Sequence, residues 1–159
     1  STFIDFDLPE ILCLAIYYLM KTFPQKKVLM FGEGEFEPPN QIQKFDLIFM
    51  PPREIEKLPD NYIDLFINTF SLGEMKKNTA ENYLNYITKS AKLFFHINQH
   101  TVPNIFSDGS KGLLAYEYKI PPEKFKLLSC SPHIGDMFDQ TRIEGKNMFC
   151  FSHLYEKIL

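Results

Sequence analysis

The segment Asp64–Met75, DLFINTFSLGEM, decides the fold that we expect for this chain. Its first half is apolar but too short for a helix, and its second half turns polar before a helical pattern begins. An apolar run of this length is typical of a strand buried on both faces, as in a parallel sheet. Ligands of open α/β sheets bind just beyond the carboxyl ends of such strands. The polar side chains at that point are therefore our first candidate site residues: Asn68, Thr69, Ser71 and Glu74.

Length and composition favour one globular domain spanning all 159 residues. The net charge is -3, and the 17 basic and 20 acidic residues are spread along the chain without a basic run, so we expect no nucleic-acid partner. No apolar run is long enough to span a bilayer, and we expect no membrane association. The odd, widely spaced set of Cys13, Cys130 and Cys150 indicates buried reduced thiols and a cytoplasmic protein.

Apolar periodicity outlines the order of the elements. We expect strands at residues 2–6, 27–31, 45–50, 63–68, 93–97, 125–129 and 147–155. The strand at 45–50 is expected near a sheet edge and that at 63–68 in the centre. Helical patterns cover residues 11–20 and 78–92, and one helical turn is expected at 53–58.

The two helices have expected caps and surroundings. Asp7 is expected to cap the first helix with Glu10 completing a capping box, and Asn78 or Thr79 to cap the second. The first helix is apolar nearly all round, which predicts burial on more than one side.

Strands that alternate with helices indicate a mainly parallel sheet. The last two strands have no helix-length pattern between them, so they are expected to form an antiparallel hairpin at its edge. The predicted fold is therefore α/β, with a Rossmann-like sheet. Residues 101–116 form a long irregular loop, which is a feature of functional or disordered segments.

A glycine pair, Gly32 and Gly34, follows the strand at 27–31 and invites a phosphate-loop interpretation. We reject it because such a loop must open a helix whose N-terminus faces the anion. Here Glu33 and two further glutamates follow, then two prolines. Glu33 either accepts hydrogen bonds from a ligand or is simply solvated.

Several segments together resemble the sugar O-methyltransferases, a family of class I S-adenosylmethionine-dependent methyltransferases. Asp7–Glu10 with the following Tyr17-Tyr18-Leu19 is similar to their second strand and helix. Ile63–Met75 is similar to their fourth strand and its polar end, and Phe95–Asn98 to the next strand end. The resemblance continues through Tyr118–Pro121 to the final hairpin and covers most of residues 7–155.

The resemblance implies a bound S-adenosylmethionine and a saccharide or other small-molecule acceptor. Asp7 would hold the ribose hydroxyls, and Glu33 would lie near the adenine. Asn68 and Thr69 would face the cofactor across the cleft from Asp7. The residues implied near the sulfonium or the acceptor are Ser71 and Glu74.

The chain departs from the family pattern at its start, because the first strand, the Gly-rich loop and the first helix have no counterpart in it. That strand would lie between the second and the fourth, and its removal leaves a gap of about 5 Å. Each buried amide left unpaired costs about 1–3 kcal/mol. We therefore expect a truncated methyltransferase-like domain, the C-terminal piece of a longer protein, that does not bind the cofactor alone. Otherwise the strands move together or another chain, as in a homo-oligomer, completes the sheet.

Methyl transfer to a hydroxyl needs a base or a metal, together with alignment of the reactants. Glu74 and His96, at the ends of adjacent predicted strands, are our candidate catalytic residues, and His133 is a third candidate base. No metal is expected, because the four histidines lack the spacing of a metal pair.

Two other classes of function stay open. The chain could be a non-catalytic methyltransferase-like domain that serves as an interaction module, which the missing cofactor loop favours. It could also be another doubly wound domain, such as a receiver-like or flavodoxin-like module. A receiver needs acidic residues and a lysine at its strand ends, whereas these ends carry Asn68 and Asn98.

Overall fold

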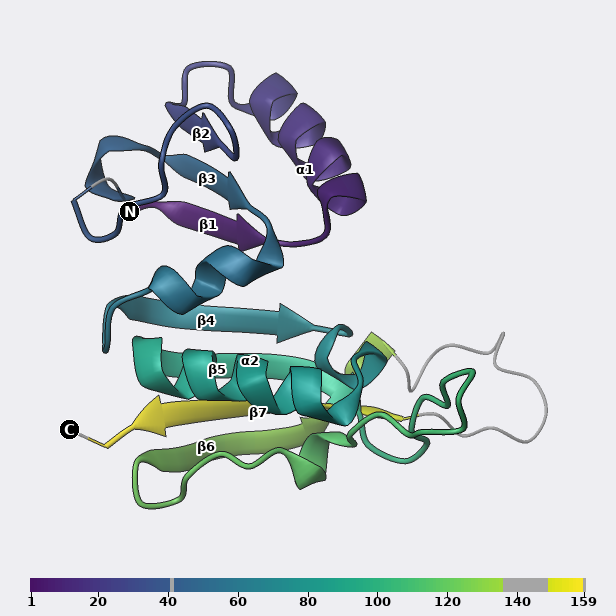
Figure 1. Ribbon diagram of the computed structural model, residues 1–159. Helices are drawn as coiled ribbons and strands as arrows, with labels where there is room; N and C mark the ends of the chain where they lie inside the picture. Colours follow the sequence, from purple (N-terminus) through teal and green to yellow (C-terminus); the bar gives the residue numbers. More distant parts are fainter. Residues whose placement is uncertain (41, 136–148, 159) are drawn as a thin grey trace. The chain divides into compact units, whose positions relative to one another are not determined.

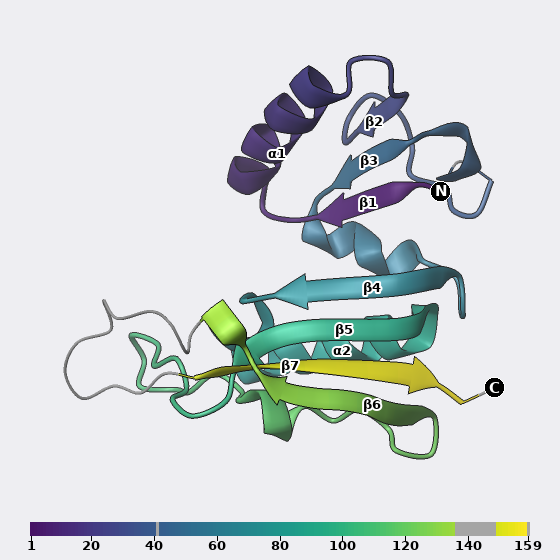
Figure 2. The same ribbon diagram turned by 180° about the vertical axis from the view of Figure 1, so that it is seen from behind.

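The structure is a computed structural model that describes residues 1–40, 42–135 and 149–158. The chain folds into two compact units, Ser1–Pro59 and Asp60–Leu159, each with its own sheet (Figures 1 and 2). It is thus a mixed α/β protein, as the sequence predicts, with one parallel sheet and one mixed sheet. Within the described ranges, no helix combines the length and hydropathy that a bilayer crossing requires.

The N-terminal unit contains a three-stranded parallel sheet with one helix, α1 (Pro9–Thr22). The order of its strands is β1 (Phe3–Phe6), β3 (Leu47–Met50), β2 (Val28–Met30). All four residues of β3 are buried, so the expectation that this strand lies near an edge is wrong. Leu47 and Phe49 pack against α1 on one face of the sheet, and Ile48 and Met50 are buried as well, as expected of an apolar run without polar alternation.

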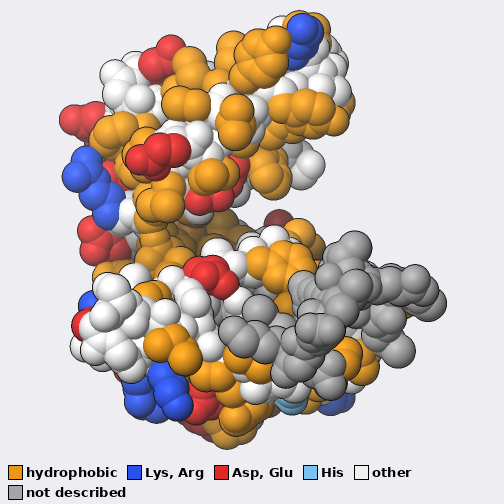
Figure 3. Space-filling model, turned by 90° about the vertical axis from the view of Figure 1, so that its right-hand side faces the viewer, with side chains coloured by type: hydrophobic (Ala, Val, Ile, Leu, Met, Phe, Trp, Pro, Cys, Tyr) orange, Lys and Arg blue, Asp and Glu red, His pale blue; other side chains and the backbone are white. Residues whose placement is uncertain are grey.

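Helix α1 covers one face of this sheet. Leu12 packs with Leu47 and Phe49 in the core, and partly buried apolar side chains surround them: Ala15, Ile16, Leu19, Val28 and Met30. Of the helix residues, all of which are described, only Leu12 is fully buried. The prediction of burial on more than one side is therefore wrong for this structure, and hydrophobic side chains gather on the outer side of the unit (Figure 3).

The start of α1 also differs from the expected capping box. Its N-cap is Leu8, which makes no side-chain cap. The Asp7 carboxylate accepts a hydrogen bond from the Leu8 backbone N–H at 2.7 Å, one residue before the helix proper. Pro9 in the first turn has no N–H to be satisfied, which reduces the need for a side-chain cap.

The C-terminal unit contains a four-stranded mixed sheet and helix α2 (Lys77–Ser90). The order of its strands is β4 (Ile63–Thr69), β5 (Ala91–Gln99), β7 (Cys150–Lys157), β6 (Phe125–Pro132). β4 and β5 are parallel, and β7 runs antiparallel to both β5 and β6. The predicted hairpin is confirmed; part of its connection, residues 136–148, lies outside the described residues.

Helix α2 packs on this sheet through Ala80, Leu84 and Ile87, which are at most 1% exposed. Its N-cap is Lys76 without a side-chain cap, so the expected caps at Asn78 and Thr79 are wrong. Short 3-10 helices complete the two units, at Ile42–Lys44, Pro52–Lys57, Leu72–Glu74 and Ala115–Glu117. The turn expected at residues 53–58 is thereby confirmed.

Strand β4, which we expected to be central and buried, is an edge strand with Leu65 46% and Ile67 57% exposed. β1 is likewise an edge strand of its own sheet. These are the two strands predicted to flank the missing first strand, and among the described residues each pairs on one side only.

The three thiols are free, but only Cys150 is buried. Cys13 and Cys130 are exposed, so the expectation of three buried cysteines is wrong for these two. Cys13 lies on the outer side of α1, and Cys130 lies on the edge strand β6.

Candidate functional site

The carboxyl end of β4 carries a hydrogen-bonded amide cluster. The Asn68 Nδ2 donates to Ser71 Oγ at 2.5 Å, and Asn98 Nδ2 donates to Asn68 Oδ1 at 3.0 Å. The chain turns sharply at Phe70, whose φ is 55°, and this turn brings Ser71 back toward Asn68. Thr69 at the strand end is exposed and stays accessible to a ligand. The predicted cofactor-facing residues of this unit therefore do gather, with Asn68 and Ser71 already bonded to each other.

Glu74 is oriented by two amides at the same rim. Its Oε1 accepts a hydrogen bond from Gln99 Nε2 at 2.5 Å, and its Oε2 accepts one from Asn104 Nδ2 at 2.8 Å. Gln99 ends β5, whereas Asn104 belongs to the long loop, so the carboxylate ties the loop to the sheet. Glu74 is nevertheless exposed and keeps lone pairs available to a further donor.

Two glycines allow the close approach on which this arrangement depends. A Cβ on Gly73 would lie 1.7 Å from Gln99 Oε1, and one on Gly112 would lie 2.5 Å from the Gly73 carbonyl oxygen. Gly112 therefore lets the long loop pass directly over the Leu72–Glu74 turn.

His96 does not lie at a strand end, and this part of the prediction is wrong. β5 continues to Gln99, and His96 is in its interior with a fully buried side chain. Neither ring nitrogen has a hydrogen-bond partner among the described residues. Burial lowers the pKa of His96 to about 3, with a smaller contribution from His153. A group so enclosed has no exposed nitrogen for an acceptor hydroxyl.

His96 belongs to a stack of imidazole rings that sequence reasoning missed. Its ring lies 4.6 Å from that of His153 at an interplanar angle of 17°, and His100 lies 6.2 Å from His153. His153 Nε2 is 3.2 Å from Cys130 Sγ on the neighbouring strand. Burial, and secondarily His100, lowers the pKa of His153. Near-parallel rings direct their lone pairs into separate planes, and no metal-binding group of acidic, His or Cys side chains occurs among the described residues.

The pairing of strands creates this stack. His96 and His153 are cross-strand partners of the antiparallel pair β5–β7, and Cys130 is the partner of His153 on β6. The spacing along the chain gives no hint of it, because the register between distant strands decides which side chains meet. His133, the third candidate base, makes an edge-to-face contact with Phe70 at 5.7 Å instead.

The N-terminal unit presents a second rim, where the three parallel strands end. Asp7 follows β1, Glu33 follows β2, and Arg53 follows β3. Asp7 is half-buried and Glu33 is exposed. Burial, and then the charge of Asp7, raises the pKa of the nearby Asp5. The Gly32–Gly34 segment forms a tight turn with Gly32 at a φ of 92°, so no phosphate-binding helix opens there.

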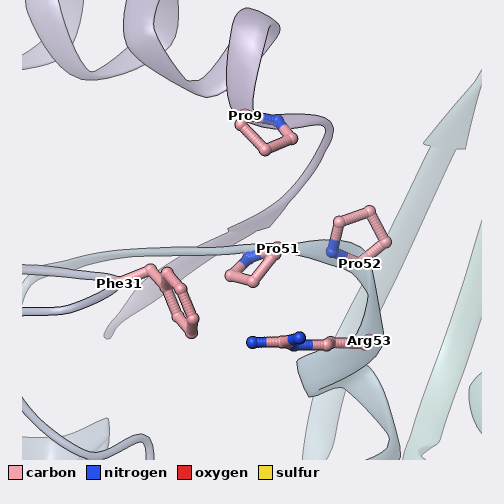
Figure 4. Close-up of a pocket in the computed structure, with 5 residues that line it drawn as sticks. All are labelled: Pro9, Phe31, Pro51, Pro52 and Arg53. Carbon is pink, nitrogen blue, oxygen red and sulfur yellow. The ribbon is translucent and has the colours of Figure 1, made fainter.

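A pocket of about 460 Å³ lies at this second rim (Figure 4). The five residues that line it are Pro9, Phe31, Pro51, Pro52 and Arg53. The Arg53 guanidinium faces the Phe31 ring, with Cζ 5.3 Å from the ring centroid. The volume of the pocket is in the range of small-molecule sites. A flat ring system of a ligand could stack on these planar groups.

Sequence reasoning placed Asp7 and Glu33 near this rim but missed Phe31 and Arg53. The prolines Pro51 and Pro52 were interpreted only as the end of a strand. The available signal was an aromatic and an arginine, each directly after a parallel strand or one turn beyond it.

No family model matches this chain, and none of the curated proteins matches it significantly. The candidate functional residues lie at the two rims. Asp7, Glu33 and the pocket belong to the N-terminal unit, whereas Asn68, Thr69, Ser71 and Glu74 belong to the C-terminal unit.

Proposed function

We propose that this chain carries the nucleoside-binding and acceptor-binding residues of an S-adenosylmethionine-dependent O-methyltransferase that acts on a sugar hydroxyl. The observation that carries the proposal is the pocket at the carboxyl rim of parallel strands, where open α/β sheets bind their ligands. Its aromatic, guanidinium and proline lining suits a purine ring, and the half-buried Asp7 carboxylate lies at the end of the adjacent strand.

In this proposal, the N-terminal unit binds the adenosine part of the cofactor. Phe31 and Arg53 stack against the adenine with their planar groups, and Asp7 accepts hydrogen bonds from the two ribose hydroxyls. Glu33, exposed at the next strand end, accepts a hydrogen bond from the exocyclic amine.

The C-terminal unit carries a separate set of candidate residues for an acceptor hydroxyl, at the carboxyl end of its own strand β4. S-adenosylmethionine, when bound, would supply an electrophilic methyl group for an acceptor hydroxyl. Glu74 takes the hydroxyl proton, and the amides of Gln99 and Asn104 hold its carboxylate in place. Asn68, Thr69 and Ser71 line the same rim. His96 has no role in this scheme because its ring is buried.

Nuclear magnetic resonance with S-adenosylhomocysteine at millimolar concentration tests the proposal, because it detects even weak binding. We expect shifts at the Phe31 ring and at the Arg53 Nε–H group. Asp7→Asn and Phe31→Ala should each raise the dissociation constant at least about tenfold, because each removes one charged hydrogen bond or one stacking partner. Glu123→Gln, an acid-to-amide change on an exposed turn, is the matched control. Absence of shifts at these residues would refute the nucleoside site.

A second function, that of a non-catalytic interaction module, is favoured by a different observation. β1 and β4 have open edges among the described residues, and large apolar side chains of α1 and β4 are exposed. Such surfaces are typical of sites that bind another polypeptide. If the chain does not bind S-adenosylhomocysteine, the result would favour this second function.

A further inference from the structure

The outer stripe of α1 combines exposed apolar side chains with one charge at each end. Leu14 is 70% exposed, Tyr17 66% and Tyr18 67%. Glu10 precedes them in the first turn, and Lys21 follows them in the last. From Glu10 the spacing to these residues is four, seven, eight and eleven positions, which places all five on one side of the helix. This side faces away from the core residues Leu12, Ala15, Ile16 and Leu19.

The two charges are about 16 Å apart along the helix, because eleven residues rise 1.5 Å each. Lys21 is held on the stripe: its Nζ lies 3.3 Å from Tyr17 Oη and 5.5 Å from the centroid of the Tyr17 ring. The stripe is therefore acidic at its N-terminal end, basic at its C-terminal end and apolar between. A surface with this pattern is complementary to itself when one copy is reversed.

We propose that α1 is a self-association surface on which a second copy of this chain docks its own α1 in antiparallel orientation. The two-fold axis passes at the height of the Ala15–Ile16 peptide bond. Glu10 of each copy then lies opposite the second copy's Lys21, at both ends of the interface. Leu14 lies opposite the second copy's Tyr17, and Tyr18 opposite its Cys13.

Charge selects the antiparallel arrangement over the parallel one. Parallel packing would bring Glu10 against Glu10 and Lys21 against Lys21, whereas the antiparallel pair has two attractive contacts. The helix dipoles also oppose each other favourably when the helices are antiparallel. Because two copies share a two-fold axis, the same patch on both is buried, as in most homodimers.

The available area predicts a weak dimer. A tyrosine that is two-thirds exposed has about 100–150 Å² left to bury. The two tyrosines and Leu14, with Ile11 and Met20 at 48% and 41% exposure on the flanks, offer roughly 500 Å² per copy. A standard interface buries about 800 Å² per partner, so we expect a dissociation constant on the order of 10–100 µM. The inference does not depend on the proposed methyl transfer.

Sedimentation velocity of the whole chain from about 10 µM to about 1 mM tests this inference across the expected dissociation constant. We expect a monomer–dimer equilibrium. Leu14→Glu should abolish it within this range. Glu10→Lys and Lys21→Glu should each weaken it at least about tenfold, because one reversal turns both attractive contacts into repulsive ones. Glu123→Lys, on an exposed turn, should leave it unchanged.

The double variant E10K/K21E decides whether the two charges pair across the interface. It restores opposite charges at both ends, so dimerisation should return to within about threefold of the original. Circular dichroism shows that α1 is intact in each variant. A monomer throughout the range would overturn the inference. So would a dimer that persists in Leu14→Glu, which would place the interface elsewhere, or a monomer that binds lipid vesicles through this stripe.

Discussion

Replacement of His96 by phenylalanine should remove much of the acid sensitivity of the C-terminal unit. His96 is fully buried, stacks on His153 at 4.6 Å, and has no hydrogen-bond partner for either ring nitrogen among the described residues. Its nearest rings on the other sides are Phe94, Tyr118 and Tyr155, at 5.1, 5.1 and 5.9 Å. A phenyl ring keeps the stacking and removes the titration.

The sign and size follow from the pKa of His96. The pKa falls from 6.5 in the unfolded chain to about 3 in the folded one. The contribution of His96 to the free energy of unfolding is therefore fully present above about pH 6.5. It is lost as pH falls, because the unfolded chain takes up a proton that the folded chain excludes. At about pH 5 the loss of unfolding free energy is about 2 kcal/mol, because pH 5 is about 1.5 units below the unfolded pKa and each unit costs about 1.36 kcal/mol. This figure does not change if the folded pKa is anywhere below about 4. The lowered pKa of His153 acts in the same direction.

Urea unfolding followed by circular dichroism at about pH 7 and about pH 5 measures this difference. The free energy of unfolding of the original chain should fall by about 2 kcal/mol or more from about pH 7 to about pH 5, and that of His96→Phe should fall by about 2 kcal/mol less. His133→Gln is the matched control, because it removes an imidazole that lies outside the stack. An unchanged pH dependence in His96→Phe would refute the account of a neutral, buried His96.

Two further predictions concern packing. Gly112→Ala should lower the free energy of unfolding by about 1–3 kcal/mol and raise amide exchange in the long loop, because its Cβ would lie 2.5 Å from the Gly73 carbonyl oxygen. Normal stability and exchange in this variant would contradict the described approach of loop and turn. Leu12→Ala should destabilise the N-terminal unit by about 2–5 kcal/mol and Phe94→Ala the C-terminal unit by about 3–5 kcal/mol. Amide hydrogen exchange measured residue by residue should show that each substitution lowers protection within its own unit. Equal loss of protection in both units would argue against two separate units.

Much of the local structure could be predicted from the sequence. The strand at β2, the helix α2 and the hairpin of β6 and β7 follow from apolar periodicity and from the distance between patterns. Neighbours in the sheet could not be predicted in the same way. The apolar runs at β3 and β4 are alike in composition, yet β3 is central and β4 is an edge strand.

The candidate site likewise has features that the local sequence predicts and features that depend on contacts between distant segments. The position of Asn68 near a strand end and that of Glu74 in the segment after it follow from local pattern, and the structure places Asn68 among the last two residues of β4 and Glu74 in the following 3-10 helix. Their hydrogen bonds to Asn98 and Asn104 join segments about 30 residues away, and no local pattern specifies them. The pocket required Phe31 and Arg53 from two different strand ends to face each other.

The sequence by itself determined approximately where this chain forms helices and strands and that Asn68 and Thr69 come at the end of one strand. These features depend on the conformation of neighbouring residues, which apolar spacing, glycine and proline govern. Only the tertiary structure decided that His96 is buried against His153, that β4 is an edge strand and that Leu14 is exposed. Burial and stacking depend on the register and order of strands that lie far apart in the chain, and the free energy that selects them comes from packing between elements.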